Sequence, residues 1–330
     1  MSASERRVVS TQLGVIFPGQ GSQAVGMLHA LGQRFREVGD TFDEASDALG
    51  YDLWKLVEGG PEQELNRTDR TQPAMLAAGV AVWRAWCAGG GPLPAVMAGH
   101  SLGEYTALVC SGSLDLAAGV ALVAERGRRM QEAVPAGTGA MAAVLGLDDA
   151  AVKRACAEAA GSEVVAAVNF NAPGQVVIAG HAAAVQRAIE KAKAAGAKRA
   201  VTLPVSVPSH CILMRRAADA YAHTLDTVGF GRPAIPVLHN VDVASYEDPT
   251  SIRNALAMQL FSPVRWVETV QAMARHGVTT LVEAGPGKVL TGLCKRIDRS
   301  MTALAVYDPD TLAQGLAAVQ DQLGEVHVAG

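Results

Sequence analysis

The sequence is poor in aromatic residues, in cysteine and in net charge, and each shortage excludes a class of protein. Aromatic residues make up 5% of the 330 residues, and the five cysteines are scattered without a CxxC pair. In a chain of this length, scattered cysteines argue against a disulfide framework or a zinc site and favour a reducing compartment. The formal net charge of −4 lacks the basic excess of nucleic-acid-binding proteins. We expect no metal ion and no nucleic-acid partner.

Long apolar runs are also absent. No run reaches the roughly 18–20 residues that a membrane-spanning helix needs. The polar start of the chain, MSASERRVVSTQLG, has no signal-peptide core. Hydrophobic residues nevertheless make up 49% of the chain, which excludes a disordered protein. These features predict a cytoplasmic, globular protein without a membrane partner, and we expect a monomer.

Short apolar runs alternate with amphipathic helical stretches along most of the chain. This alternation is typical of α/β proteins with a largely parallel sheet. Ser113 is a plausible N-cap for the helix that follows it. Strands are predicted at 13–17, 94–98, 236–240 and 280–283, and helices at 71–88, 251–260 and 267–274.

The sharpest local signal is the segment AGHSLGE, in which Gly99-His100-Ser101-Leu102-Gly103 matches the GxSxG nucleophile elbow. In that turn a strand runs directly into a helix, and the serine is held in a strained backbone conformation. The helix is expected to open at Ser101, where its N-terminal N–H groups would favour an oxyanion. The alternative is a plain N-cap serine.

Residues 137–205 follow a different order of elements. They read strand, helix, strand, strand, helix, strand (βαββαβ), which is typical of ferredoxin-like folds. The predicted fold class is therefore α/β: an α/β-hydrolase-like large domain from residues 1–136 and 206–330, with residues 137–205 inserted as a small domain. A groove between two domains is a common place for a functional site.

A serine nucleophile needs a base, and eight histidines compete for that role. His210 ends the segment VTLPVSVPSHC, just past an apolar strand and a proline, where α/β proteins present reactive groups. His100 precedes Ser101, but neighbouring side chains point apart at an elbow, so we expect it to pack beside the site. From the residues alone, His210 could equally be structural. Arg126 in ERGRRM is by default a helix-end cation, and Gln20 in PGQGSQ is by default a turn residue.

Signals for a bound cofactor are weak. The segment GQGSQAVG does not match GxGxxG, and no GxxxxGK[ST] occurs. The segment GPGK at residues 285–288 is explained by a tight turn before a helix, and the histidines lack metal-ligand spacing. The sequence predicts no cofactor.

Several longer segments together resemble one known family. They are GVIFPGQGSQAVGML, TQPAMLAAGVAVW, MAGHSLGEYTALVCSGSL, ERGRRMQEAVPAGTGAM, NFNAPGQVVIAG, PVSVPSHCILM and VEAGPGKVLTGL. In this order they are similar to the malonyl-CoA:acyl-carrier-protein transacylases of bacterial type II fatty acid synthesis, from about residue 13 to 310. The resemblance implies that malonyl-CoA and acyl carrier protein are partners, and that a malonyl group moves between their thiols.

The resemblance also implies residue roles. Ser101 of GHSLGE would be the nucleophile, His210 of PSH the general base, and Arg126 of ERG the ligand of the malonyl carboxylate. The backbone N–H groups of Gln20 and Leu102 would form the oxyanion hole. A guanidinium is a planar, permanently charged, bidentate partner for a carboxylate, which favours the ligand interpretation of Arg126.

Gln259, before LFSPVRW, would lie near the histidine. There a backbone carbonyl, in place of a carboxylate, would orient the imidazole.

Three alternative functions compete with this one. An acyl hydrolase or thioesterase would use the same Ser–His pair with water as the acceptor, and a trans-acting acyltransferase of a polyketide synthase would serve another carrier. A carrier-docking module with a vestigial site is argued against by the intact Ser101, His210 and Arg126.

Overall fold

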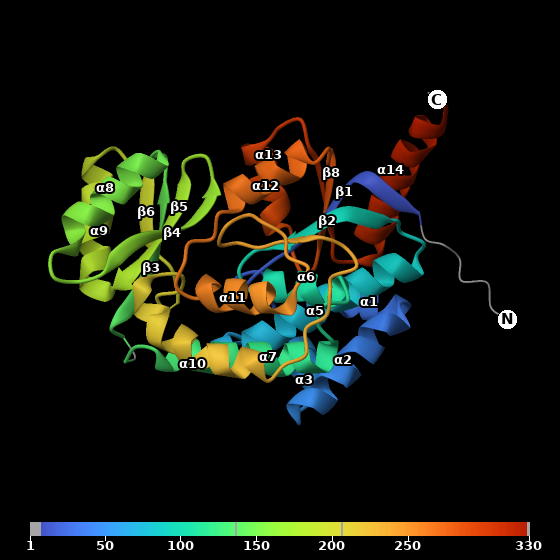
Figure 1. Ribbon diagram of the computed structural model, residues 1–330, viewed down its shortest axis with the longest axis horizontal. Helices are drawn as coiled ribbons and strands as arrows, with labels where there is room; N and C mark the ends of the chain where they lie inside the picture. The colour runs from blue at the N-terminus through green and yellow to red at the C-terminus, as the bar shows by residue number, and fades with distance from the viewer. Residues whose placement is uncertain (1–7, 136, 206, 329–330) are drawn as a thin grey trace.

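The chain folds around two β-sheets that differ in strand direction, as the computed structural model in Figure 1 shows. The structure describes residues 8–135, 137–205 and 207–328. The first sheet is parallel throughout, in the order β7-β2-β1-β8-β9, and the second is antiparallel, in the order β4-β5-β3-β6. The strands are β1 (Val9–Phe17), β2 (Leu93–Gly99), β3 (Gly139–Leu145), β4 (Val165–Ala172), β5 (Gln175–His181), β6 (Arg199–Thr202), β7 (Val237–Leu238), β8 (Thr280–Ala284) and β9 (Thr302–Val306).

Helices cover both faces of the parallel sheet. On β1, Leu13, Val15 and Phe17 pack into one core with α5, α6 and α7, whereas Ile16 points into a second core with α12 and α13. Burial on both faces explains why the strands are nearly continuous apolar runs. The helices outside the antiparallel sheet and its connections are α1 (His29–Arg34), α2 (Arg36–Leu49), α3 (Leu53–Gly59), α4 (Glu62–Leu65), α5 (Thr68–Ala88), α6 (Gly103–Cys110), α7 (Leu116–Glu132), η1 (Ile212–Met214), α10 (Arg215–Asp226), α11 (Pro249–Gln259), α12 (Trp266–Arg275), α13 (Val289–Ile297) and α14 (Pro309–Val328).

The antiparallel sheet has the order that a βαββαβ chain gives in ferredoxin-like folds. One face, with Val144 and Ile178, packs against α8 (Asp149–Ala160) and α9 (Ala182–Ala194). The opposite face carries Met141 and Val177, which line a cavity shared with the parallel-sheet elements. The predicted α/β class with a small ferredoxin-like sheet is therefore confirmed.

Two predicted helix starts are wrong. Asp115, not Ser113, caps α7, because its carboxylate accepts the backbone N–H of Ala118 at 2.8 Å. The Ser113 hydroxyl instead donates to the carbonyl of Gly231 at 2.7 Å. Likewise α6 begins at Gly103 and not at Ser101, since Ser101 has a φ of 52°, outside the right-handed helical region.

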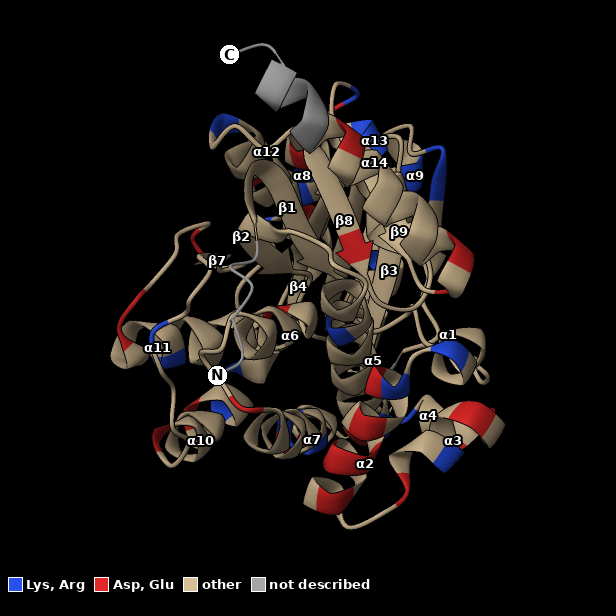
Figure 2. Cartoon of the chain, turned by 90° about the vertical axis from the view of Figure 1, so that its right-hand side faces the viewer, with Lys and Arg blue, Asp and Glu red and all other residues tan. Residues whose placement is uncertain are grey.

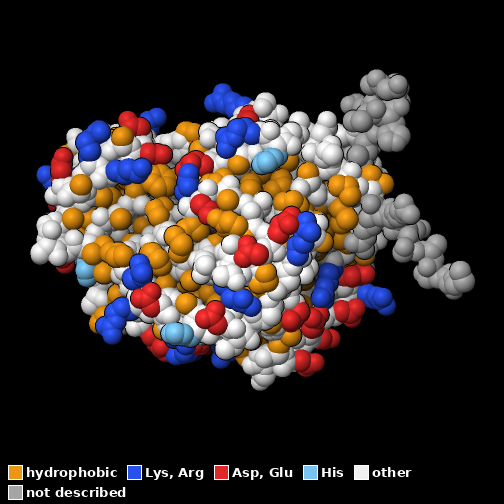
Figure 3. Space-filling model, viewed as in Figure 1, with side chains coloured by type: hydrophobic (Ala, Val, Ile, Leu, Met, Phe, Trp, Pro, Cys, Tyr) orange, Lys and Arg blue, Asp and Glu red, His pale blue; other side chains and the backbone are white. Residues whose placement is uncertain are grey.

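The molecular surface carries charges of both signs. Figure 3 shows Lys and Arg interspersed with Asp and Glu on one face, while Figure 2 shows acidic bands on α2. That helix buries Val38, Phe42 and Ala45 at helical spacing, so its acidic residues form the solvated side of an amphipathic helix. Among the described residues, no helix combines the length and apolar character required to cross a lipid bilayer.

Candidate active site

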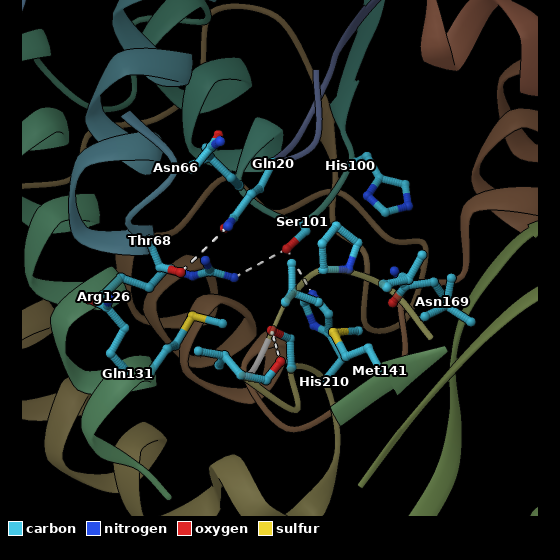
Figure 4. Close-up of a pocket in the computed structure, with 18 of the residues that line it drawn as sticks. Gln20, Asn66, Thr68, His100, Ser101, Arg126, Gln131, Met141, Asn169 and His210 are labelled. Carbon is cyan, nitrogen blue, oxygen red and sulfur yellow. Dashed lines mark hydrogen bonds between the residues drawn. The ribbon is translucent and has the colours of Figure 1, made fainter. Parts of the chain in front are cut away.

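The turn after β2 holds Ser101 in an unusual conformation. A Cβ atom on Gly99 would lie 1.8 Å from the carbonyl carbon of Gly103, and one on Gly103 would lie 2.1 Å from the carbonyl oxygen of Phe17. Only glycine fits these two positions. Ser101 itself adopts a left-handed φ of 52°, which costs roughly 1–2 kcal/mol for a residue with a side chain. The strained turn directs the hydroxyl into the cavity (Figure 4).

Ser101 and His210, predicted from separate motifs, are hydrogen-bonded. The Ser101 Oγ lies 2.8 Å from Nε2 of His210, and Nδ1 of His210 lies 2.8 Å from the backbone carbonyl oxygen of Gln259. Because a carbonyl can only accept, Nδ1 carries the proton and Nε2 is free to accept the serine proton. Burial and, next, the nearby Arg126 cation lower the pKa of His210 to about 3. The imidazole is therefore neutral at pH 7 and able to act as a base.

Arg126 lies beside this pair as a buried cation. Arg126 is only 1% exposed, and Nη2 of its guanidinium lies 3.3 Å from the Ser101 Oγ. Nη1 donates to Gln72 and Nη2 to Gln259, each at 2.8 Å to a side-chain amide oxygen. No acidic side chain among the described residues forms an ion pair with it. A buried charge without a counter-charge is costly, so the site is suited to an anionic ligand.

The backbone N–H groups of Gln20 and Leu102 are available to a ligand. Neither donates a hydrogen bond within the described part of the chain, and Leu102 immediately precedes α6. The Gln20 side chain reaches Thr68, with 3.5 Å between Nε2 and Oγ1 (Figure 4). Both residues line the same cavity as Ser101, as two donors to an oxyanion would.

The cavity around these groups has a volume of about 260 Å³. Its walls come from both sheets and their connections, as Figure 4 shows for Met141 and Asn169 opposite Gln20 and Arg126. His100 lines the same cavity, but its Nε2 lies 2.8 Å from Oδ1 of Asn171, so the ring is engaged away from the serine. The structure thus agrees with the expectation that His100 packs beside the site.

A buried hydrogen-bond network that no motif predicted lies beneath the elbow. Asn240 accepts the Ser101 N–H at 2.7 Å and donates to the Gly99 carbonyl at 2.8 Å. The fully buried Glu104 carboxylate accepts from the Asn240 N–H at 2.8 Å, from Gln259 Nε2 at 2.9 Å and from His239 Nδ1 at 2.7 Å. These bonds tie the turn to the segments that carry Gln259 and Asn240. Glu104 lies within the GHSLGE motif and Asn240 at the end of a predicted strand, but neither position reveals its remote partners.

The fold and this site are those expected of an acyl-transferring enzyme. The comparison with protein families agrees, because residues 15–330 match the family described as "Acyl transferase domain". That match covers nearly the whole chain.

Individual relatives show which kind of acyl transferase this chain resembles. The chain is 58% identical over 306 residues to the malonyl CoA-acyl carrier protein transacylase of Escherichia coli strain K12, covering 93% of this chain and 99% of the relative. A crystal structure of an acyl carrier protein S-malonyltransferase from Vibrio cholerae has a TM-score of 0.90 at 58% identity, covering 92% and 99% of the two chains. A malonyl-transacylase in complex with its type II polyketide synthase acyl-carrier protein has a TM-score of 0.92 at 55% identity, covering 93% and 99%.

The chain belongs to the acyl transferase family and, within it, to the malonyl-CoA:acyl carrier protein transacylases. The resemblance predicted from the motifs is thereby confirmed. So is the activity class, that of an acyl-carrier-protein S-malonyltransferase active in fatty acid synthesis.

Proposed function

We propose that this chain moves a malonyl group from malonyl-CoA to the phosphopantetheine thiol of an acyl carrier protein through an ester on Ser101. The observation that carries this proposal is the buried Arg126 cation, which has no described carboxylate partner and lies 3.3 Å from the Ser101 hydroxyl. An acyl group that ends in a carboxylate would supply the missing negative charge.

The first half of the proposed reaction loads the enzyme. His210 accepts the Ser101 proton at Nε2 while Oγ attacks the thioester carbon, and the new C–O bond places negative charge on the carbonyl oxygen. The N–H groups of Gln20 and Leu102 stabilise that oxygen. The C–S bond then breaks, and His210 returns the proton to the departing sulfur, which leaves as coenzyme A.

The second half reverses these steps with a different thiol. The carrier's thiol gives its proton to His210 and attacks the ester, after which the C–O bond breaks and Ser101 regains a proton. The Gln259 backbone carbonyl holds the imidazole in one tautomer at both stages. The 2.8 Å distance between the carbonyl oxygen and Nδ1 of His210 supports this role. Donor and acceptor therefore use one site in turn, and no cofactor is required.

The acceptor distinguishes a transferase from a thioesterase. We expect the malonyl-enzyme, isolated after loading, to lose its malonyl group at least about a hundred times faster with holo-acyl carrier protein than in buffer, because a thiolate is a far stronger nucleophile than water. Quenched-flow sampling with mass analysis measures both rates. The apo-carrier, which has no pantetheine thiol, is the matched control. Equal loss in buffer and with holo-carrier would contradict the proposal and favour the hydrolase.

The carrier of fatty acid synthesis is our first candidate partner. The relative that was solved with a polyketide carrier is 55% identical to this chain, so a polyketide synthase carrier is the second candidate. Comparing kcat/KM for the two holo-carriers would rank them.

We further propose that residues 1–136 and 206–330 form one domain and residues 137–205 another. Strands β3 to β6, from Gly139 to Thr202, form a sheet of their own, which supports this division.

We also propose that the protein is a monomer in a reducing, cytoplasmic compartment. The scattered cysteines support the compartment. Few large hydrophobic side chains of the described residues are exposed, which supports the monomer: Val8, Val9, Val25, Val201, Ile212, Met258 and Val289.

A further inference from the structure

A second glutamine, Gln72 on α5, holds the Arg126 guanidinium from the side opposite Gln259. Gln72 is 1% exposed, and its Oε1 accepts the hydrogen bond from Nη1 at 2.8 Å. Gln259 accepts from Nη2 and also binds the Ser101 carbonyl and the Glu104 carboxylate. Gln72 has a narrower set of polar contacts: besides Arg126, only the Met130 sulfur, 3.6 Å from its Nε2, is a partner in the described residues.

The orientation of the Gln72 amide is unambiguous. A guanidinium only donates hydrogen bonds, so the amide oxygen must face Arg126, and the amide nitrogen then faces the soft Met130 sulfur. The amide oxygen of Gln72 is therefore a neutral, buried acceptor on α5 that fixes one nitrogen of the guanidinium. A polar side chain this deeply buried needs such a partner.

The neutrality of both holding groups has a consequence for selectivity. A carboxylate at either position would pair with Arg126 and cancel the charge that an incoming anion meets. Two amide oxygens restrain the guanidinium and leave its full charge directed at the cavity. The Tyr105 ring, whose centroid lies 5.5 Å from the guanidinium carbon, adds a further neutral support.

We propose that Gln72 is a positioning residue that sets the selectivity of the site for acyl groups bearing a carboxylate. It does so by fixing Nη1 of Arg126 without neutralising the cation. This inference rests on the proposed function, in which Arg126 binds the malonyl carboxylate. Gln72 touches neither of the reacting atoms, so its effect passes through Arg126.

Substitution at this position separates the hydrogen bond from the charge. In Gln72→Met the side chain keeps its length and loses the hydrogen bond. A hydrogen bond to a charged group contributes roughly ten- to a hundredfold in equilibrium terms, so we expect kcat/KM for malonyl-CoA to fall about tenfold. In Gln72→Glu a carboxylate of similar shape pairs with Arg126, and we expect a fall on the order of a hundredfold. Acetyl-CoA has no carboxylate, and its kcat/KM should change less than about threefold.

The measurement is the ratio of kcat/KM for malonyl-CoA to that for acetyl-CoA, with thermal unfolding as a check on folding. Gln131→Glu is the matched control, because Gln131 is an exposed residue of the same cavity without a hydrogen bond to Arg126. It adds the same charge to the cavity without pairing with Arg126, so it should lower the ratio less than Gln72→Glu does. Arg126→Ala is the reference for the proposed function.

The outcomes separate the two claims. If Arg126→Ala leaves the malonyl-to-acetyl ratio unchanged, the proposed function fails, and this inference with it. If Arg126→Ala collapses the ratio while Gln72→Met and Gln72→Glu keep it, only the role of Gln72 is wrong. If Gln131→Glu lowers the ratio as far as Gln72→Glu does, any nearby charge suffices and the inference is again overturned. Should Gln72→Glu fail to fold, Gln72→Met still decides the question.

Discussion

Replacing His210 by alanine is expected to lower kcat/KM for malonyl-CoA by at least about a thousandfold, while the fold is retained. The imidazole takes the Ser101 proton in the first step and protonates the leaving sulfur afterwards. A single positioned acid or base contributes roughly 10²–10⁴-fold, and here one residue fills both roles. The 2.8 Å contact between Nε2 and the serine oxygen places it to do so. Initial-rate assays at saturating carrier would measure the change.

His100→Ala is the comparison for this variant. His100 is partly buried at the cavity wall, but its Nε2 is held by Asn171. Its loss therefore acts through packing, and we expect less than about a tenfold decrease. Circular dichroism and thermal unfolding would verify that both variants fold. If His100→Ala were the more damaging of two well-folded variants, the base would have been assigned to the wrong histidine.

Arg126→Ala is expected to change substrate preference as well as rate. The malonyl carboxylate would enter a partly dry cavity and find no counter-charge. Truncating one side of a buried charge pair costs about 2–5 kcal/mol, which is roughly 30- to several-thousandfold in kcat/KM. Acetyl transfer should fall little or rise, since the site loses a cation that an acetyl group cannot satisfy.

The ratio of kcat/KM for malonyl-CoA over acetyl-CoA measures this change directly. Arg128→Ala is a suitable control on the same helix, because Arg128 is exposed and paired with Glu125 and Glu132. An Arg126 that merely stabilised the end of α7 would lower both rates together and leave the ratio at its native value. That result would contradict the assignment of Arg126 to the substrate carboxylate.

Features encoded within a short stretch of sequence could be predicted. The elbow is one of them, because a Cβ atom on Gly99 would meet the carbonyl carbon of Gly103 within the turn itself. The βαββαβ order of the small sheet is another, since each strand and helix has its own hydrophobic period. The cap of α7 was missed because Ser113 and Asp115 are both good N-caps, and the contact that decided it, from Ser113 to Gly231, is remote in sequence.

The support of the site could not be predicted, since it depends on partners brought together by tertiary packing. Asn240 binds the N–H of a residue 139 positions away, and Glu104 binds a glutamine side chain 155 positions away. The sequence around Gln72 gives no local sign that Arg126 would be its partner. Ser101, His210 and Arg126 were suggested by motifs, but their distances required the fold.

The central claim is that Ser101 carries the malonyl group between two thiols, and intact-mass analysis tests it most directly. The protein would be mixed with malonyl-CoA alone, without any carrier, and quenched in acid. The account predicts one added malonyl group on the native chain, located on the peptide that contains Ser101, and none on Ser101→Ala, because the first half of the reaction needs no acceptor. A Ser101→Ala protein that is still malonylated, or that still transfers malonyl to the carrier, would contradict it.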